Sequence, residues 1–386
     1  MWNIKSTLVI GVFLLCSTTY SGDKLWKKHV IEEDVGYALS ARGLDVNSDG
    51  IADILSSRSG EVVLFLSPHW QKKIIHTLSS KKNTTIIHST LIDVDGDGDL
   101  DLVASVYGKY LFWLQQPENG STGKWKYYLI DTKLKGSHCL SAVDIDGDGK
   151  MELLAGSALA EGQYPESLVY FHIPENPTKT KQWKFQVFAP ESTAGSNAHY
   201  FGTGDVNGDG LVDIACAGKG EGKALQGAWF AWWEQPKNPQ AEWKKRFISQ
   251  SLAGATHIEM MDVNQDKKMD FVATCGHGKG VYWFEAPHWK PHAIDESLED
   301  GHTLLLTDLD GDGDKDLVLC SNSGAAQMVW YEYDFKSKAL YTKHVIDKGN
   351  QSYHLSALDM DGDGDLDILN AGAWSNNLVW YENPLK

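Results

Sequence analysis

Seven short acidic segments recur along the chain with the spacing of a metal-binding loop. In each nine-residue segment Asp, Asn or Glu occupies positions 1, 3, 5 and 9, and Gly occupies position 6 in six of the seven. Oxygen ligands at this spacing, on a tight turn that needs glycine's freedom, suit Ca²⁺. The predicted ligands are Asp45, Asn47, Asp49 and Asp53; Asp93, Asp95, Asp97 and Asp101; Asp144, Asp146, Asp148 and Glu152; Asp205, Asn207, Asp209 and Asp213; Asp262, Asn264, Asp266 and Asp270; Asp308, Asp310, Asp312 and Asp316; and Asp359, Asp361, Asp363 and Asp367.

The alternative is that these segments are acidic turns without an ion. Carboxylates so close together repel one another unless a cation offsets them, so the calcium interpretation is the stronger one. Because the loops recur in every repeat, we expect the ions to be structural. The fifth loop has Lys267 and Lys268 at positions 6 and 7, so we expect six or seven calcium sites.

Histidines form a second recurring set. Six of the seven repeats carry a histidine five or six residues before the first Asp of the loop: His88, His138, His199, His257, His302 and His354. Converging imidazoles can transfer protons, bind a transition metal or hold an anionic substrate. The alternative is that each histidine bonds the backbone of a neighbouring repeat.

Both sets must be positioned by short strands. The acidic loops begin 46 to 61 residues apart, and each repeat reads as four strands. The first strand ends at the loop and the second follows it; the third is rich in aromatic residues, and the fourth usually opens with Trp-Lys. Four short strands at this period predict the blade of an all-β, seven-bladed propeller. The last repeat lacks a fourth strand, and a spare one begins at Trp26, which predicts ring closure by the N-terminal strand.

These repeats resemble the FG-GAP/VCBS repeat family of β-propellers across essentially the whole of residues 22–386, which we treat as one domain. The resemblance implies the propeller fold and calcium loops, and by itself says little about function.

Strand alternation indicates which side chains line the central channel. Residues three before each loop are mostly polar or small, which suits a channel wall, and residues two earlier share that face. This places His88, His257 and His354 on the wall, whereas His138, His199 and His302 need a bulge or the preceding turn to reach it. We assign catalytic roles to the six histidines and Tyr200. We assign substrate-binding roles to Arg42, Arg58, Lys219, Glu259 and His277.

A channel mouth rich in His, Tyr and Arg suits β-elimination next to a carboxylate. The segment from Gly276 to the C-terminus is similar to propeller proteins grouped with sugar dehydratases, of the aldos-2-ulose dehydratase and ulvan oligosaccharide dehydratase kinds. The resemblance implies a dehydratase acting on anionic, uronic-acid-containing oligosaccharides. Separately from the resemblance, the converging histidines are candidate ligands for an additional transition metal at the channel mouth. The alternative is a calcium-stabilised propeller that binds carbohydrate or protein without chemistry.

Composition limits the other classes. The net charge is −17, and more than half of the 52 acidic residues lie in the seven loops, so seven divalent ions would offset most of it. No basic stripe suggests nucleic acid, and no segment suggests a membrane span. Residues 1–21 read as a secretory signal peptide, which predicts a periplasmic or secreted protein. A lipoprotein anchored at Cys16 is the weaker interpretation because Leu15 is bulky. The cysteines Cys139, Cys216, Cys275 and Cys320 read as small buried residues.

Overall fold

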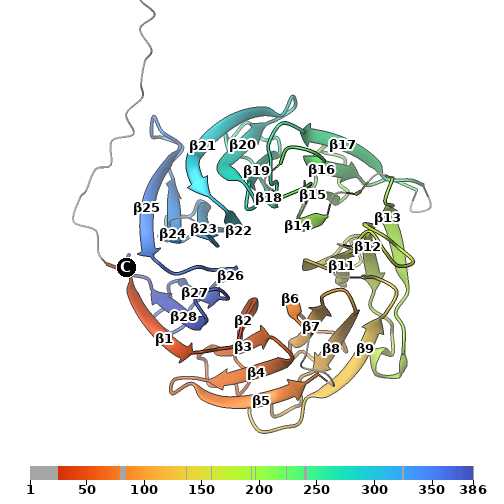
Figure 1. Ribbon diagram of the computed structural model, residues 1–386, viewed down its shortest axis with the longest axis vertical. Coiled ribbons are helices and arrows are strands. Elements are labelled where there is room, and N and C mark those ends of the chain that lie inside the picture. Colours follow the sequence, from red (N-terminus) through yellow and green to blue (C-terminus); the bar gives the residue numbers. More distant parts are fainter. Residues whose placement is uncertain are drawn as a thin grey trace, which may run out of the picture.

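The chain folds into a seven-bladed β-propeller (Figure 1). The computed structural model describes residues 25–78, 84–135, 137–157, 159–192, 194–195, 197–222, 224–238, 241–323 and 326–385. These residues form seven four-stranded antiparallel sheets around a central axis. The predicted all-β, seven-bladed architecture is confirmed. The predicted signal peptide lies outside the described residues.

Six blades are simple meanders, each running from an inner to an outer strand. Blade 1 contains β2 (Ser40–Leu44), β3 (Asp53–Arg58), β4 (Glu61–Leu66) and β5 (Gln71–Thr77). Blade 2 contains β6 (Ile86–Ile92), β7 (Asp101–Val106), β8 (Tyr110–Gln115) and β9 (Lys126–Asp131). Blade 3 contains β10 (Leu140–Val143), β11 (Glu152–Gly156), β12 (Leu168–His172), the 3-10 turn η1 (Pro177–Lys179) and β13 (Phe185–Ala189). Blade 4 contains β14 (Ala198–Gly204), β15 (Asp213–Lys219), β16 (Ala228–Glu234) and β17 (Lys244–Ser249). Blade 5 contains β18 (His257–Met261), β19 (Asp270–Thr274), β20 (Lys279–Glu285) and β21 (Lys290–Glu299). Blade 6 contains β22 (Gly301–Thr307), β23 (Asp316–Ser321), β24 (Gln327–Tyr333) and β25 (Tyr341–Lys348).

Blade 7 draws its strands from both ends of the chain. Its inner strands are β26 (His354–Leu358), β27 (Asp367–Gly372) and β28 (Asn377–Glu382). Its outer strand is β1 (Lys27–Glu33), which pairs antiparallel with β28, with Val30 opposite Val379. In Figure 1 the red β1 lies beside the blue β28.

The core lies between the blades. Seven hydrophobic clusters of the described residues each join the facing sides of two adjacent sheets. One, for example, packs Leu55 and Leu64 of blade 1 against Leu102 and Phe112 of blade 2. In β16, Trp229 and Trp233 face blade 3 whereas Trp232 faces blade 5, as strand alternation requires. The four described cysteines are buried and unpaired, as predicted.

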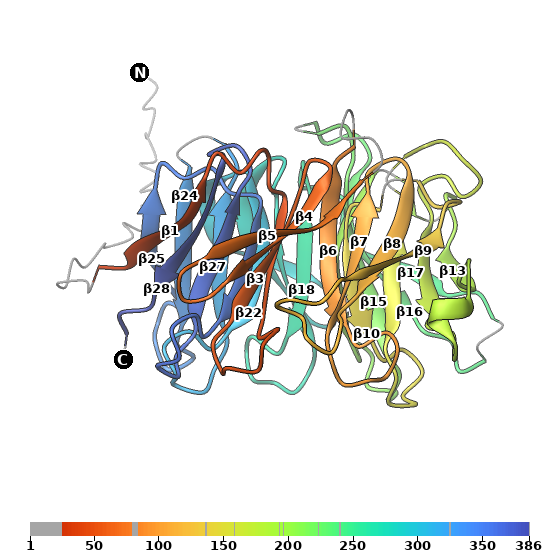
Figure 2. The same cartoon turned by 90° about the horizontal axis from the view of Figure 1, so that it is seen from below.

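The strands run between two faces of a disc (Figure 2). Each inner strand ends at an acidic loop on one face, and the turn between the second and third strands returns to the other. We call the face that holds the start of the inner strands the histidine face, and the opposite one the loop face. Within the described part of the chain, no helix is long and apolar enough to cross a membrane.

Candidate functional site

The starts of the inner strands form two stacked rings of side chains around the channel. The upper ring holds the residues six before each loop: Leu39, Ile87, His138, His199, Thr256, His302 and Tyr353. The lower ring holds the next residues: Ser40, His88, Cys139, Tyr200, His257, Thr303 and His354. All fourteen are buried. The upper ring is divided, since Leu39, Ile87 and Tyr353 pack with Ala373 in an apolar cluster, and histidines occupy the other side.

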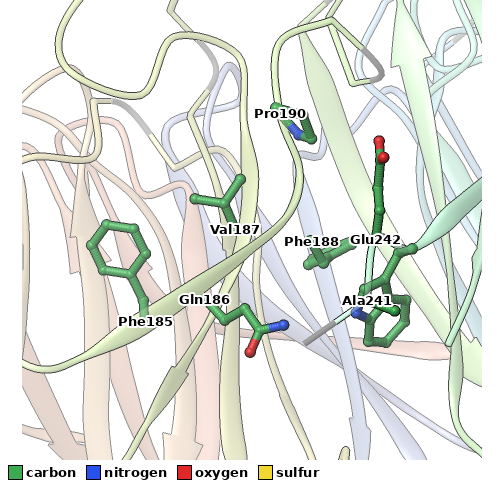
Figure 3. A pocket seen from close by; sticks show the side chains of 8 residues that line it. Phe185, Gln186, Val187, Phe188, Pro190, Ala241 and Glu242 are labelled. Carbon is green, nitrogen blue, oxygen red and sulfur yellow. The ribbon is translucent and has the colours of Figure 1, made fainter. Parts of the chain in front are cut away.

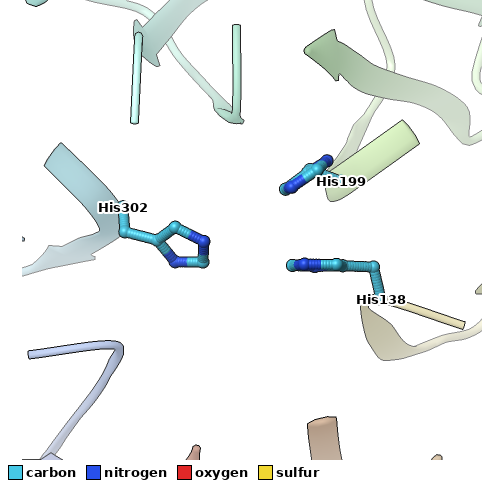
Figure 4. A group of neighbouring side chains, drawn as sticks. All are labelled: His138, His199 and His302. Carbon is cyan, nitrogen blue, oxygen red and sulfur yellow. The ribbon is translucent and has the colours of Figure 1, made fainter. Parts of the chain in front are cut away.

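Three upper-ring histidines come together. His138, His199 and His302 each offer a ring nitrogen within 4.8 Å of the others. Figure 4 shows the three rings converging from three different blades. The ring centroids of His138 and His199 are 3.9 Å apart. Three ligand atoms this close on rigid strands make a candidate metal centre.

Backbone carbonyls on the far side of two of these rings favour the tautomer that leaves the other nitrogen free to bind a metal. We assign an Nδ1–H to His199, which donates to the carbonyl of Asn197 over 2.8 Å, and to His302, which donates to the carbonyl of Tyr353 over 3.3 Å. Both rings then carry the lone pair on Nε2. Nε2 of His302 and Nδ1 of His138 are buried without a hydrogen-bond partner among the described residues. A carbonyl that fixes the far nitrogen is the usual support of a metal-bound histidine.

Burial keeps these histidines neutral. Desolvation, with His277 and Lys219 nearby, lowers the pKa of His138 to about 3. Desolvation also lowers the pKa values of His199 and His302 well below the usual value, and neighbouring histidines add to the shift. Neutral imidazoles can accept a proton or bind a metal at neutral pH.

Irregular strand pairing or the preceding turn brings the upper-ring histidines to the channel, as strand alternation predicted. Pairing between the first and second strands is irregular between Ala198 and Phe201 in blade 4 and between Gly301 and Thr303 in blade 6. His199 and His302 lie inside these irregularities, which turn them inward. His138 precedes the first paired residue of β10, Leu140, so the preceding turn places it.

The lower-ring histidines are tied to the scaffold. The N–H of Leu140 donates to Nδ1 of His88 over 3.2 Å, and the N–H of Leu304 donates to Nδ1 of His257 over 3.1 Å. Each donor belongs to the next blade, so these two histidines follow the alternative interpretation, in which they bond a neighbouring backbone. The Nε2 of His257 contacts Glu259 Oε1 at 3.0 Å. His354 lies edge-on to His88, and its Nδ1 has no partner in the described part of the chain.

Tyr200 connects the two rings. Its ring stacks on His257 with centroids 4.2 Å apart, and its hydroxyl lies 3.5 Å from His302 Nδ1 and 3.4 Å from Thr303 Oγ1. Burial raises its pKa, so the phenol keeps its proton. Its position indicates that Tyr200 orients His302.

The predicted substrate-binding residues separate into two groups. His277 lies in the cluster, with Nε2 3.0 Å from His199 Nε2, and Lys219 is close enough to lower the pKa of His138. Both side chains are partly exposed at the histidine face. Arg42 and Glu259 instead lie farther down the channel, three residues before their loops.

Two arginines already have partners. Arg42 Nε donates to the carbonyl of Ser89 over 2.8 Å, and burial lowers the Arg42 pKa to about 10. Arg58 is buried, donates to Glu32 of β1 and to the carbonyl of Val35, and lies outside the histidine cluster. We therefore correct the substrate-binding assignment of Arg58, because its guanidinium holds the N-terminal segment against blade 1.

Tyr353 is a member of the site that the sequence analysis missed. Its hydroxyl lies 2.9 Å from His138 Nε2, and its ring centroid lies 4.1 Å from that of His302. Burial raises its pKa well above the usual value. Its place in the repeat was the available signal, since it occupies the position that His138, His199 and His302 hold in theirs.

The acidic loops gather carboxylates on the loop face. Oxygens within 4.8 Å of one another come from Asp93, Asp95 and Asp97; Asp144, Asp146 and Glu152; Asp308, Asp310 and Asp312; and Asp359, Asp361 and Asp367. The other three loops carry Asn at position 3. In the fifth, Lys268 Nζ lies 2.9 Å from Asp266 Oδ2.

The acid at position 9 has a structural role that the loop motif did not predict. Asp53 accepts one N–H from Val46, at position 2 of its own loop, and another from Ser67, just after the third strand. Asp101, Asp213, Asp270, Asp316 and Asp367 accept an equivalent pair. This buried carboxylate fastens the loop to the third strand in six blades, and Glu152 keeps the first of the two bonds.

A cavity elsewhere on the molecule holds no comparable cluster of histidines or carboxylates among the described residues. A hollow of about 640 Å³ lies at the outer rim between blades 3 and 4 (Figure 3). Its lining includes Phe185, Phe188, Trp243 and Glu242. It brings no cluster of titratable groups together, so the histidine face remains the candidate site.

Comparison with known proteins agrees with this architecture of propeller blades and acidic loops. A family model described as FG-GAP-like repeat matches residues 45–104, 93–155, 187–273 and 308–370, which together are more than half of the chain. The chain therefore belongs to the FG-GAP-like repeat family. Integrin alpha-PS2 of Drosophila melanogaster is 28% identical over 123 residues, which is 30% of this chain and 9% of that protein.

Solved structures share the fold at low identity. BBS1N in complex with ARL6DN matches with a TM-score of 0.59 at 13% identity, covering 93% of this chain and 97% of the other. A lectin of Agrocybe aegerita that recognises non-reducing terminal N-acetylglucosamine matches with a TM-score of 0.51 at 13% identity, covering 90% and 86%. Likeness at this level speaks for the fold alone.

Proposed function

We propose that this chain is an exported carbohydrate lyase that removes water by β-elimination from uronic-acid-containing oligosaccharides at the histidine face. The observation that carries the proposal is the buried cluster of neutral imidazoles, His138, His199 and His302, with Tyr353 and the partly exposed His277 beside it. A binding propeller needs no such group of neutral bases next to a phenol.

The same three histidines fit a transition metal. Each ring offers one nitrogen to the cluster. Nε2 of His302 and Nδ1 of His138 lack a hydrogen-bond partner among the described residues, and backbone carbonyls lie on Nδ1 of His199 and of His302. A bound divalent ion would act as a Lewis acid toward the substrate carboxylate.

The chain's own residues provide the remaining roles. Lys219, the cation at the mouth, suits the uronate carboxylate. His277 takes the proton from the carbon next to the carboxylate, the electron pair forms the carbon–carbon double bond, and the neighbouring carbon–oxygen bond breaks. Tyr353, which keeps its proton, protonates the departing hydroxyl, which leaves as water. Tyr200 orients His302. Burial, with the Arg42 charge as the second cause, lowers the pKa values of His88 and His354.

We further propose that the acidic loops bind structural Ca²⁺ and that β1 closes the ring. Four loops gather three carboxylates each, whereas Lys268 competes for the fifth. The pairing of β1 with β28 gives blade 7 the same four strands as the other blades.

A non-catalytic binding propeller is the second candidate, favoured by membership of the FG-GAP-like repeat family. The test is to incubate protein loaded with Zn²⁺ or Mn²⁺ with a panel of uronic oligosaccharides. We expect ultraviolet absorbance from a conjugated double bond and a mass loss of one water. His302→Gln should abolish both, whereas His69→Ala, at an exposed histidine on the loop face, should change neither. Binding without product across the panel would favour the second candidate.

A further inference from the structure

Exposed aromatic side chains stand at the rim of the histidine face, beside the proposed site. Trp374, in the turn between β27 and β28, is 43% exposed, and Tyr37, just before β2, is 39% exposed. Their rings meet edge to face, with centroids 6.0 Å apart and planes at 85°. The tryptophans of the third strands, by contrast, pack between blades. The pair therefore presents aromatic surface to solvent that the propeller core does not use.

Hydrogen bonds hold the two aromatic segments together in advance. Asn376 accepts from Gly36 N–H over 2.9 Å through its side chain and from Val35 N–H over 3.2 Å through its carbonyl. Its side-chain amide donates to Asp34 over 3.0 Å. Tyr37 has φ of 66°, a conformation that a tyrosine adopts only when its surroundings impose it. The pair is therefore preorganised, which lowers the entropic cost of binding.

The rim is continuous with the histidine cluster. The ring of Trp374 lies 5.4 Å from that of Tyr353, whose hydroxyl contacts His138. A ligand resting on Trp374 and Tyr37 would therefore adjoin the cluster. Tyr107, in the turn between β7 and β8 on the histidine face, is a third exposed aromatic residue.

We propose that Trp374 and Tyr37 form a subsite for a pyranose ring of an oligosaccharide, adjacent to the unit that reaches the histidines. One face of a pyranose is lined by C–H groups that pack on aromatic rings, while its hydroxyls suit the indole N–H, the phenol and the carboxylate of Asp34, which bonds Asn376. Two rings are far smaller than the surface that a stable protein partner covers. The order of sugar units rests on the proposed function, whereas binding at the rim does not.

The experiment measures binding without turnover. Full-length protein kept in Ca²⁺, with no transition metal added, is titrated with uronic oligosaccharides of two to six units, followed by tryptophan fluorescence and saturation-transfer NMR. We expect Trp374→Ala to raise the Kd about tenfold and Tyr37→Ala to raise it less. Tyr127→Ala is the matched control, because this tyrosine is equally exposed, at 39%, on the outer strand β9.

The outcomes separate the two proposals. Oligosaccharides that bind wild type and Trp374→Ala equally, or bind neither protein, would overturn the subsite. Tight binding that depends on Trp374, together with no product from metal-loaded protein, would support the subsite and reject the lyase. Product formation with an unchanged KM in Trp374→Ala would support the lyase and reject the subsite. Thermal unfolding of each variant, with an unchanged Tm expected, checks that the rim substitutions leave the fold intact.

Discussion

The two ends of the inner strands differ in almost every physical respect. At the loop face, charged carboxylates repeat seven times with nearly the same spacing and are largely exposed, apart from the buried acid at position 9. At the histidine face, neutral imidazoles and phenols are buried, and the seven repeats carry different residues at equivalent positions. The upper ring alone holds Leu39, Thr256, His302 and Tyr353 in equivalent places.

This difference separates structure from function within one repeat. A feature that every blade needs is repeated, as the acid at position 9 shows by bonding the third strand in six blades. A feature that acts once is asymmetric, as the histidine side of the upper ring shows by facing an apolar side. The loop face should therefore control stability, and the histidine face should control activity.

Calcium removal should have the largest effect and should act on stability. Each ion that binds only the folded chain contributes about 2.7 kcal/mol when its concentration is a hundred times its Kd. Removing the ions from several sites with a calcium chelator should therefore lower the Tm strongly. The transition-metal content at the histidines is measured separately. Calorimetry with and without Ca²⁺ tests this, and a Tm indifferent to Ca²⁺ would contradict the loop assignment.

The pH dependence of the calcium-free protein provides a second measurement. Burial raises the pKa of Asp101 to about 8 and the pKa values of Asp316 and Asp367 to about 7. The folded chain then holds protons that the unfolded chain releases, so stability is lost as pH rises through these values. Below about pH 6.5 the buried histidines act in the opposite direction, because unfolding lets them take up protons. We therefore expect the Tm to fall between pH 6.5 and 8.5 without Ca²⁺ and to stay level with it.

Removing one imidazole of the cluster should affect activity more than stability. His302→Gln leaves a polar side chain near the carbonyl of Tyr353 but removes the converging Nε2. We expect loss of one equivalent of Zn²⁺ after dialysis, measured by elemental analysis, and at least a hundredfold loss of lyase rate. Calcium content should not change. Full metal binding in this variant would show that the convergence of the three rings is not a site.

A lower-ring histidine should show the opposite balance. His257→Ala leaves the N–H of Leu304 without its partner in a buried position, which costs about 1 to 3 kcal/mol of unfolding free energy. Urea unfolding measures that cost. Zn²⁺ content should remain at one equivalent. A stable variant that loses its metal would place His257 with the upper ring and remove the distinction between the two layers.

Tyr353→Phe isolates the hydroxyl that lies on His138. The ring remains to pack against Trp374 and Leu39, so the Tm should change little. Tyr353→Phe removes both the hydrogen-bond partner of His138 and the proposed acid, so the lyase rate should fall about 10- to 100-fold. A fall in kcat with unchanged KM is expected, since the substrate rim is intact, and an unchanged kcat would exclude Tyr353 from proton transfer.

The sequence predicted the fold because the fold depends on repeated local signals. The acidic loops and the third-strand aromatics recur in every repeat, and the spare N-terminal strand matches the one that the last repeat lacks, so seven blades could be counted. The site was harder to predict from the sequence, because it depends on irregular pairing in β14 and β22 and on the turn before β10. Strand alternation alone gave preference to His88 and His257, which bond neighbouring blades, over His199 and His302, which converge. Tyr353 was overlooked because no histidine marked its position.

The fifth loop offers the smallest and most local test of the loop face. Lys267 occupies position 6 with φ of 68°, where the other loops have Gly, and its N–H still donates to Asp262 over 2.8 Å. At the equivalent Gly364 an added Cβ would meet open space, so glycine is needed there for its backbone conformation. Lys267→Gly should therefore stabilise the protein by at most about 1 kcal/mol, because relief of left-handed strain is partly offset by glycine's entropy. Gly364→Lys is the reverse control and should destabilise it. If both variants have the wild-type Tm, position 6 does not limit loop geometry, and the glycine repeat must be explained by ion binding alone.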